Sequence, residues 1–175
     1  MGEVYHEHLI KKKMTVTDIL VRAFFVCLCL LPVPFLLVSN VMVYALLLII
    51  AFVYLAIFMF RQTDVEYEYL YLSGECQFDK ICGKNKRKGC GKLEMEKVEI
   101  IAPEDSEKLA EFEKQVYKLR DFSSHDTTVE NRYVAFERKD SNLIKVIFEP
   151  SEAIINEMKM TAPRKVIVKG EKSYI

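Results

Sequence analysis

Six basic side chains gather in one short segment, and they are the strongest candidates for binding chemistry in this sequence. They lie within positions 80–92, with no acidic residue between them. We expect the ligand contacts to be Lys84, Lys86, Arg87, Lys88 and Lys92, and the ligand to be an anionic lipid or an acidic protein. Each basic residue near an anionic bilayer contributes about 1 kcal/mol of attraction. The same charges also fit a solvated hairpin tip that keeps a strand edge soluble.

Nucleotide and nucleic-acid binding do not fit this segment. A phosphate-binding P-loop needs G-x-x-x-x-G-K-[ST] between a strand and a helix. Gly83 and Gly89 have a different spacing, and Gly91-Lys92 is followed by Leu93. The segment also has no interleaved aromatic residues on which single-stranded nucleic acid would stack. The whole chain balances 25 basic against 25 acidic residues, which favours no nucleic-acid partner.

Metal-binding and catalytic motifs are also missing from the sequence. Cys76, Cys82 and Cys90 are spaced more widely than the Cys-x₂₋₄-Cys pairs of zinc sites, so we expect buried or half-buried strand thiols. His6 and His8, with Glu3 and Glu7, form a short cluster that we assign to a frayed or amphipathic leader. Neither G-x-S-x-G nor H-E-x-x-H occurs. We therefore expect no metal, no cofactor and no enzymatic activity.

A long uncharged segment precedes the basic one. Residues 23–60 contain no charged side chain, and Ser39-Asn40 is the only strongly polar pair among them. One spanning helix needs about 20 apolar residues, so the segment is long enough for two passes. The pattern predicts transmembrane helices at about residues 15–38 and 41–60. Pro32 and Pro34 should kink the first helix, end it early or belong to the turn.

The start of the first helix is open to more than one interpretation. Asp18 and Arg22 are four residues apart, so they can pair on one helix face and mark its interfacial end. The alternative is a functional charge inside the membrane. A cleaved signal peptide is a rival interpretation of the whole first helix, but no small-x-small cleavage site stands out and a second apolar segment follows directly.

Basic residues flank the two helices on one side. Lys11, Lys12, Lys13 and Arg22 come before or at the start of the first helix, and Arg61 follows the second, whereas the connecting turn has no Lys or Arg. The positive-inside rule therefore predicts a multi-pass protein of the cell membrane with both termini in the cytoplasm. Three cysteines in the soluble part, an odd number, agree with a reducing compartment.

Beyond Arg61 the sequence predicts a cytoplasmic domain over residues 62–168, with a leader at 1–14 and a tail at 169–175. Alternation puts Tyr67, Tyr69 and Tyr71 on one face of a strand. The expected elements are strands at 67–72 and 76–82, a hairpin loop at 83–89, a strand at 92–101 with a bulge between Met95 and Val98, a helix from Pro103 to Val116, strands at 117–122, 133–138 and 143–148, and a helix at 151–161.

This order gives an α+β fold: a transmembrane helical hairpin followed by a small antiparallel-β domain with an inserted helix and a C-terminal helix. The last helix resembles that of pleckstrin-homology-like (PH-like) barrels. The segments that carry a wider resemblance are 65–69, 74–81, the basic turn 85–88, and 146–151 with 162–166. In these segments the chain resembles small membrane proteins of unknown function from Gram-positive, clostridia-like bacteria, which are related in layout to bacterial PH-like domain proteins. That resemblance implies a PH-like domain and supplies no active site.

We expect a membrane protein whose cytosolic domain acts as an interaction or scaffold module with an unidentified protein partner. The alternative is a module that senses anionic lipid through the basic loop. No small-xxx-small pattern in the helices supports oligomerisation, so the sequence leaves the oligomeric state open.

Overall fold

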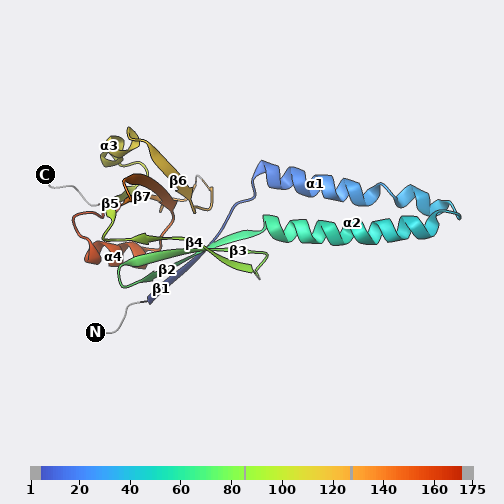
Figure 1. Ribbon diagram of the computed structural model, residues 1–175, viewed down its shortest axis with the longest axis horizontal. Helices are drawn as coiled ribbons and strands as arrows, with labels where there is room; N and C mark the ends of the chain where they lie inside the picture. The colour runs from blue at the N-terminus through green and yellow to red at the C-terminus, as the bar shows by residue number, and fades with distance from the viewer. Residues whose placement is uncertain (1–4, 85, 127, 171–175) are drawn as a thin grey trace. The chain divides into compact units, whose positions relative to one another are not determined.

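The structure is a computed structural model, and it describes residues 5–84, 86–126 and 128–170 (Figure 1). Glu3 and the rest of residues 1–4, Asn85 of the expected hairpin loop and residues 171–175 of the expected tail lie outside the described residues. The chain divides into two compact units. One unit is a helical hairpin together with residues 82–86, and the other contains the remaining strands and the C-terminal helix.

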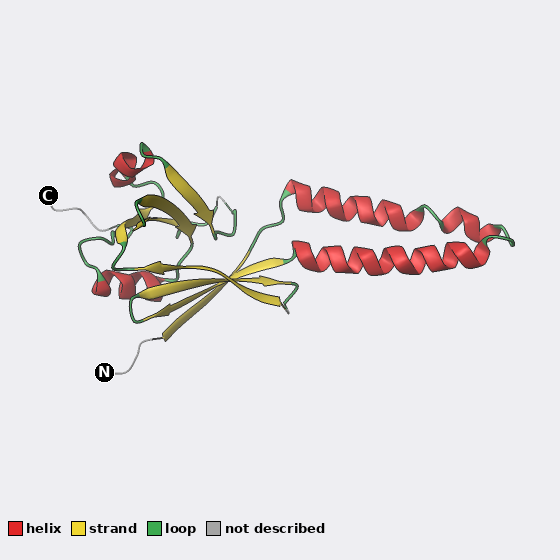
Figure 2. Ribbon diagram, viewed as in Figure 1, coloured by secondary structure: helices red, strands yellow, loops and turns green. Residues whose placement is uncertain are grey.

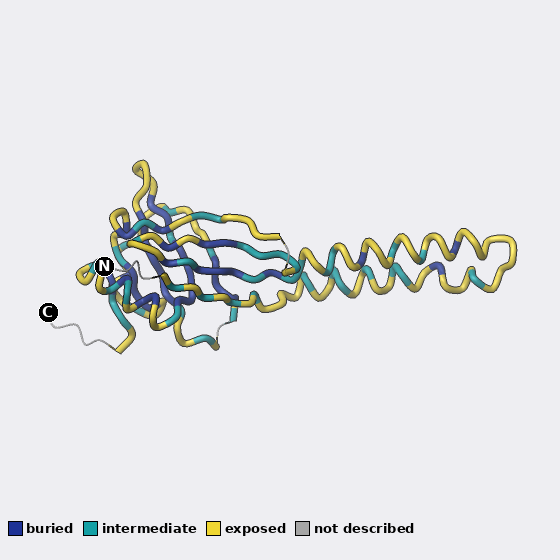
Figure 3. The backbone as a smooth tube through the Cα atoms, turned by 90° about the horizontal axis from the view of Figure 1, so that it is seen from below, coloured by how far each residue is buried: buried dark blue, intermediate teal, exposed yellow. Residues whose placement is uncertain are grey.

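The helical unit consists of α1 (Val16–Leu30), the short 3₁₀ helix η1 (Val33–Leu37) and α2 (Met42–Thr63), which run side by side as a hairpin (Figure 1). No residue of α1 is buried, and only Ala45 and Ala56 of α2 are (Figure 3). Such exposed apolar surface is costly in water and favourable in lipid. The segments Val16–Leu37 and Met42–Thr63 are long and apolar enough to cross a membrane.

The two prolines divide the first span. α1 ends at Leu30, and the chain continues through Pro32 into η1, where the N–H of Phe35 donates to the carbonyl of Pro32 at 3.1 Å. Proline has no N–H to donate and its ring clashes with the preceding turn, so a continuous α-helix stops here. The predicted single helix over 15–38 is therefore two pieces, and the prediction that the prolines end it early is confirmed.

Within the described residues, the strands form two four-stranded sheets (Figure 2). Sheet A has the order β1-β2-β3-β4 and contains β1 (Tyr5–Lys11), β2 (Val65–Leu72), β3 (Glu75–Cys82) and β4 (Lys86–Glu94). Sheet B has the order β5-β7-β8-β6 and contains β5 (Val98–Pro103), β7 (Tyr133–Lys139), β8 (Asn142–Phe148) and β6 (Tyr117–Asp121). β6 runs parallel to β8, whereas the β1–β2, β5–β7 and β7–β8 pairs are antiparallel. The α+β class with mainly antiparallel pairing is confirmed.

Strand β1 replaces the leader expected over residues 1–14. It pairs with β2 over seven residues, from Tyr5 opposite Leu72 to Lys11 opposite Glu66. Of the two alternatives, a frayed or an amphipathic leader, the frayed one was wrong, because the partner strand of this segment lies on the far side of the helical hairpin in sequence. The hairpin is therefore an insertion between two neighbouring, hydrogen-bonded strands of sheet A.

The predicted tyrosine face of β2 forms part of the core between the sheets. Tyr67, Tyr69 and Tyr71 are all buried. The Tyr69 ring meets Phe78 of β3 edge-on at 5.3 Å, and Phe78 stacks on Phe122 at 4.5 Å. The Tyr69 hydroxyl donates to the carbonyl of Phe122 at 2.7 Å, which satisfies the one polar atom of this buried side chain.

Helix α4 (Glu152–Thr161) confirms the helix expected at 151–161. Ser151 caps it by accepting from the N–H of Ile154 at 3.4 Å. Ile154, Ile155 and Met158 of α4 are buried, so one face of the helix packs into the domain.

Two predictions for the middle of the chain were wrong. The expected strand at 92–101 is in fact the end of β4, a turn at 95–97 and the start of β5, so the slip in alternation marks the passage from sheet A to sheet B. Pro103 does not open a helix but ends β5. The inserted helix is limited to η2 (Glu107–Leu109) and α3 (Ala110–Glu113), because the chain turns first, with the N–H of Ser106 donating to the carbonyl of Pro103 at 2.9 Å.

The short inserted helix covers the outer face of sheet B. Leu109 of η2 is buried, and Phe112 of α3 stacks on Phe136 of β7 at 5.3 Å. The apolar cluster on this face contains Ala102, Leu109, Val134, Phe136, Leu143 and Ile147. Sheet B is therefore covered by apolar side chains on both faces.

Candidate functional site

The basic segment forms the tip of the β3–β4 hairpin. Gly83 and Lys84 have left-handed φ angles of 56° and 62°, as the tight turn of a twisted hairpin requires. The loop predicted at 83–89 is shorter, because β4 already begins at Lys86. Successive side chains of a strand point to opposite faces. Lys86, Arg87 and Lys88 therefore alternate between faces.

The tip lies against the end of α2. The Gly83 N–H donates to the carbonyl of Asp64, the residue after α2, at 2.8 Å. A Cβ at position 83 would lie 2.9 Å from the Cβ of Arg61 and 3.0 Å from its carbonyl oxygen, so no larger residue fits without a shift. This contact places Lys84 next to the last turn of α2, which carries Arg61.

A further cation lies at the same end of the helical hairpin. The guanidinium of Arg22 donates from Nε and Nη2 to the Thr63 hydroxyl at 3.2 and 3.1 Å and lies 5.5 Å from the centre of the Phe60 ring. Asp18, the expected partner of Arg22, instead accepts from the backbone N–H of Thr15 at 3.0 Å and caps α1. Arg22 and Arg61 therefore both lie at the end of the hairpin where α1 begins and α2 ends.

Two of the five predicted ligand contacts are used inside the domain. Arg87 Nη2 lies 2.9 Å from Glu68 Oε1, and the Glu68 side chain is only 2% exposed. Lys92 Nζ lies 3.1 Å from Glu75 Oε1 and 3.2 Å from Glu94 Oε1. These hydrogen bonds raise the pKa of Lys92 above its usual value, and Glu75 contributes more to the rise than Glu94.

Three predicted contacts remain available. Lys84, Lys86 and Lys88 are exposed, and no ion pair forms at any of them with the described part of the chain. Sequence alone could not separate these three from Arg87 and Lys92, since Glu68 and Glu75, which pair with those two, lie on other strands. The candidate anion site is therefore the tip, defined as Lys84, Lys86 and Lys88.

The cysteines lie where strand thiols were expected. Cys76 is buried, which raises the pKa of its thiol, while Cys82 and Cys90 are half-buried and free. Within residues 5–84, 86–126 and 128–170 there is no group of three His, Cys, Asp or Glu side chains that could hold a metal ion. His8 faces the ring of Tyr69 at 6.0 Å, and burial lowers the pKa of His8.

One serine, histidine and aspartate do meet, after β6. The Ser123 hydroxyl donates to Asp121 Oδ1 at 2.7 Å and lies 3.3 Å from His125 Nδ1. Asp121 Oδ2 lies 3.8 Å from the same ring nitrogen, His125 Nδ1, and Ser123 is fully buried, so the three side chains do not have the roles of a catalytic triad. They stabilise a turn in which His125 has a φ of 62°.

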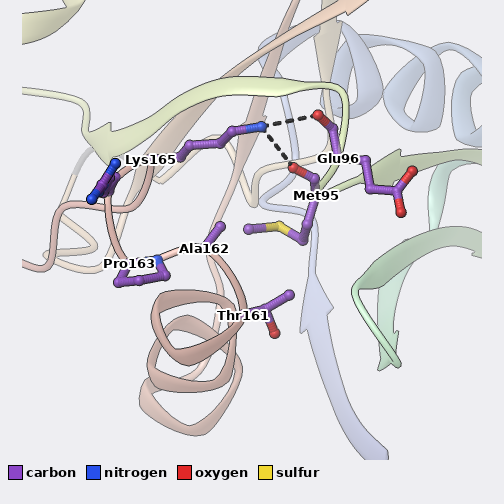
Figure 4. A pocket seen from close by; sticks show the side chains of 7 residues that line it. Met95, Glu96, Thr161, Ala162, Pro163 and Lys165 are labelled. Carbon is purple, nitrogen blue, oxygen red and sulfur yellow. Dashed lines mark hydrogen bonds between the residues drawn. The ribbon is translucent and has the colours of Figure 1, made fainter.

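A hollow of about 330 Å³ lies beside the end of α4 (Figure 4). Lys165 crosses it and donates from Nζ to the backbone carbonyls of Met95, at 3.3 Å, and Glu96, at 2.9 Å (Figure 4). The charged group of Lys165 is thus used to join the β4–β5 turn to the C-terminal segment.

The family model described as "Bacterial PH-like domain (DUF6106)" matches residues 2–168. The chain belongs to this family. Because the match includes β1 and both apolar helices, the inserted hairpin is part of the family pattern and not an addition to it. Comparison with curated proteins and with solved structures gives no match.

Sequence reasoning missed three residues that define the geometry of this PH-like domain and its tip. Thr63 binds Arg22, Gly83 packs on Arg61, and Glu68 binds Arg87. Gly83 carried a detectable signal, since glycine next to a predicted strand end is typical of a tight turn. Thr63 and Glu68 carried none, because their partners are distant in sequence.

Proposed function

We propose that this protein is a non-enzymatic, membrane-anchored PH-like module that interacts with the anionic surface of the bilayer through its β3–β4 tip. The two apolar helices are the anchor, and Lys84, Lys86 and Lys88 are the headgroup contacts. The domain that follows serves as an interaction module at the membrane surface.

The pairing of β1 with β2 supports the proposed topology. These strands carry the two ends of the inserted hairpin and are hydrogen-bonded to each other, so both ends emerge on the same side of the membrane. Lys12 and Lys13 before the first helix and Arg61 in the last turn of the second are basic, whereas the connecting residues 38–41 are not. The positive-inside rule then assigns the domain, and both termini, to the cytoplasm.

The observation that carries the proposal is the hydrogen bond from the Gly83 N–H to the Asp64 carbonyl. It holds the hairpin tip at the end of the second span, which is the level of the lipid headgroups if α2 crosses the bilayer. Each lysine at that level contributes about 1 kcal/mol of attraction to an anionic leaflet. Salt should weaken this attraction strongly, because the Debye length falls to about 3 Å at 1 M.

Lysine footprinting of the full chain in nanodiscs tests the proposal. The protein is acetylated in nanodiscs of phosphatidylcholine alone or with phosphatidylglycerol, and each lysine is quantified by mass spectrometry. We expect Lys84, Lys86 and Lys88 to react several-fold more slowly in anionic nanodiscs at low salt. At 1 M salt the difference should vanish.

Lys139 at the end of β7 is the matched control, because it is exposed and lies in sheet B. It should react equally in both kinds of nanodisc. Equal reactivity of the three tip lysines in both kinds of nanodisc would overturn the lipid contact. In that case the tip would be assigned to an acidic protein partner.

A further inference from the structure

The outer face of sheet A carries a row of charged side chains, one on each strand. Glu7 lies on β1, Glu68 on β2, Asp79 on β3 and Arg87 on β4. Glu68 is 2% exposed and Asp79 is 5% exposed, although both lie on the face away from the tyrosine core. Two of these three carboxyl groups therefore have little access to water, and Arg87 pairs with one of the two, Glu68.

The two oxygens of Glu68 have different surroundings. Oε1 accepts from Arg87 Nη2 at 2.9 Å, whereas no donor among the described residues reaches Oε2, which is buried. Glu7 and Glu68 are diagonal neighbours on the same face of the β1–β2 pair, because Glu7 lies opposite Leu70 and Leu9 lies opposite Glu68. Glu7 in turn accepts from the Tyr5 hydroxyl at 3.0 Å. Two neighbouring carboxylates, one of them buried, repel each other unless one of them holds a proton.

We propose that Glu7 and Glu68 share one proton, and that this proton fastens strand β1 to sheet A. A protonated carboxyl on either residue supplies the missing donor for the Glu68–Glu7 contact, and Arg87 neutralises the remaining negative charge. Loss of the proton leaves two carboxylates, with Asp79 close by, against a single arginine. The edge strand that precedes the membrane hairpin then opens more easily.

The pKa of Glu68 agrees with this geometry. Burial raises the pKa above 4.5, the Glu7 contact raises it further, and Arg87 opposes both. The closed strand therefore holds a proton that the open strand releases. Between pH 4.5 and the raised pKa, rising pH favours opening by up to about tenfold per pH unit, and above that pKa the effect levels off.

Amide hydrogen exchange on the full chain in detergent micelles tests the proposal. Exchange of residues 5–11 is followed from pH 4.5 to 8, corrected for the intrinsic rate and referred to the buried strand β7. In the unmodified protein, β1 protection should fall as the pH rises. The amide of Glu68→Gln can donate to Glu7 at every pH. In this variant the fall in β1 protection that depends on Glu68 should be absent.

Glu66→Gln is the matched control, since Glu66 is on the same strand and pairs with Lys11 at its end. It should keep the fall in protection seen in the unmodified protein. Glu7→Gln, on the exposed side of β1, should remove the fall as Glu68→Gln does and serves if Glu68→Gln does not fold. An infrared band of a protonated carboxyl above pH 5, lost in both Gln variants, gives a second readout. Identical pH profiles of β1 in the unmodified protein and Glu7→Gln would overturn the proposal.

Discussion

The two sheets of this PH-like domain are stabilised in different ways. Sheet B is covered by apolar side chains on both faces, and its strands β7 and β8 are almost continuously buried. Sheet A packs its tyrosine face against the core but covers its other face with Glu68, Asp79 and their partners. Burial of apolar surface depends little on pH, whereas paired charges depend on protonation and salt. The stability of sheet A should therefore respond more strongly to pH and salt than the stability of sheet B.

The inserted hairpin and the basic tip each connect two strands of sheet A. The helices lie between β1 and β2, and Lys84 lies between β3 and β4. Sheet B carries neither. Under the proposed function, the membrane anchor and the candidate anion site are therefore both connected to the sheet whose outer face carries buried charges.

The largest effect should come from the core of sheet B. Phe136→Ala removes a ring that is fully buried, stacks on Phe112 and meets Tyr117 edge-on at 5.8 Å. We expect a loss of about 3–5 kcal/mol in the free energy of unfolding, because the cavity cannot collapse between two covered faces. The free energy of unfolding is measured by guanidinium denaturation in detergent, followed by the near-ultraviolet circular dichroism of the tyrosines.

Leu119→Ala on β6 is the control for this prediction, since Leu119 is 58% exposed. It should change the free energy of unfolding by less than about 0.5 kcal/mol. A similar loss in both variants would contradict the view that double-sided burial stabilises sheet B.

Loss of the charge that faces Glu68 should have an intermediate effect. Arg87→Gln leaves the buried Glu68 carboxylate without its cation, and we expect a loss of about 1–3 kcal/mol at neutral pH. The double variant Arg87→Gln with Glu68→Gln should recover most of it, because neither buried charge nor repulsion remains. Lys92→Gln, whose partners are more exposed, should cost less than Arg87→Gln. If the double variant is less stable than Arg87→Gln alone, the pair is not electrostatic in origin.

The sequence predicted sheet A and sheet B unequally well. Alternation located the tyrosine face of β2 and the β7–β8 hairpin, because these residues face a core along their whole length. It missed β1, whose polar side chains take their place only through a partner beyond the membrane hairpin. The prediction that Pro103 begins a helix was wrong, because proline is common both at helix starts and at the ends of edge strands.

The candidate site was predicted as a set of charges and not as a geometry. Counting lysines found the tip, but the pairing of Arg87 with Glu68 depends on which strands are neighbours in sheet A. The packing of Gly83 on Arg61 depends on where α2 ends, and the helix continues to Thr63 rather than stopping at residue 60. Such contacts between distant segments have no local signal.

A smaller effect should follow from displacing the tip. Gly83→Ala places a methyl group 2.9 Å from the Cβ of Arg61 at a left-handed φ. Gly170→Ala meets the same kind of backbone strain, at a φ of 85°, with nothing within 4 Å. We expect Gly83→Ala to cost about 1 kcal/mol more than Gly170→Ala and to abolish the lipid protection of Lys84 in footprinting. Unchanged protection in Gly83→Ala would show that the contact with α2 does not position the tip.

The smallest effect concerns the inner face of β1. His8 is half-buried against Tyr69, and burial lowers the pKa of His8 below 6.5, while Glu149 opposes that shift. The open strand therefore binds a proton more readily than the closed one, so β1 protection should fall as the pH drops from 6.5 towards the lowered pKa. This dependence is opposite in sign to that of Glu68, and it is seen alone in the Glu68→Gln chain.

Adding His8→Gln to Glu68→Gln should therefore make the exchange of β1 independent of pH, whereas adding His6→Gln should leave the remaining dependence in place. His6 is the matched choice because it lies on the same face, opposite Tyr71. A pH dependence that survives in the His8→Gln double variant would mean that a group outside β1 controls its opening. A flat profile would show that the two faces of one edge strand hold proton sites that act in opposite directions on its opening.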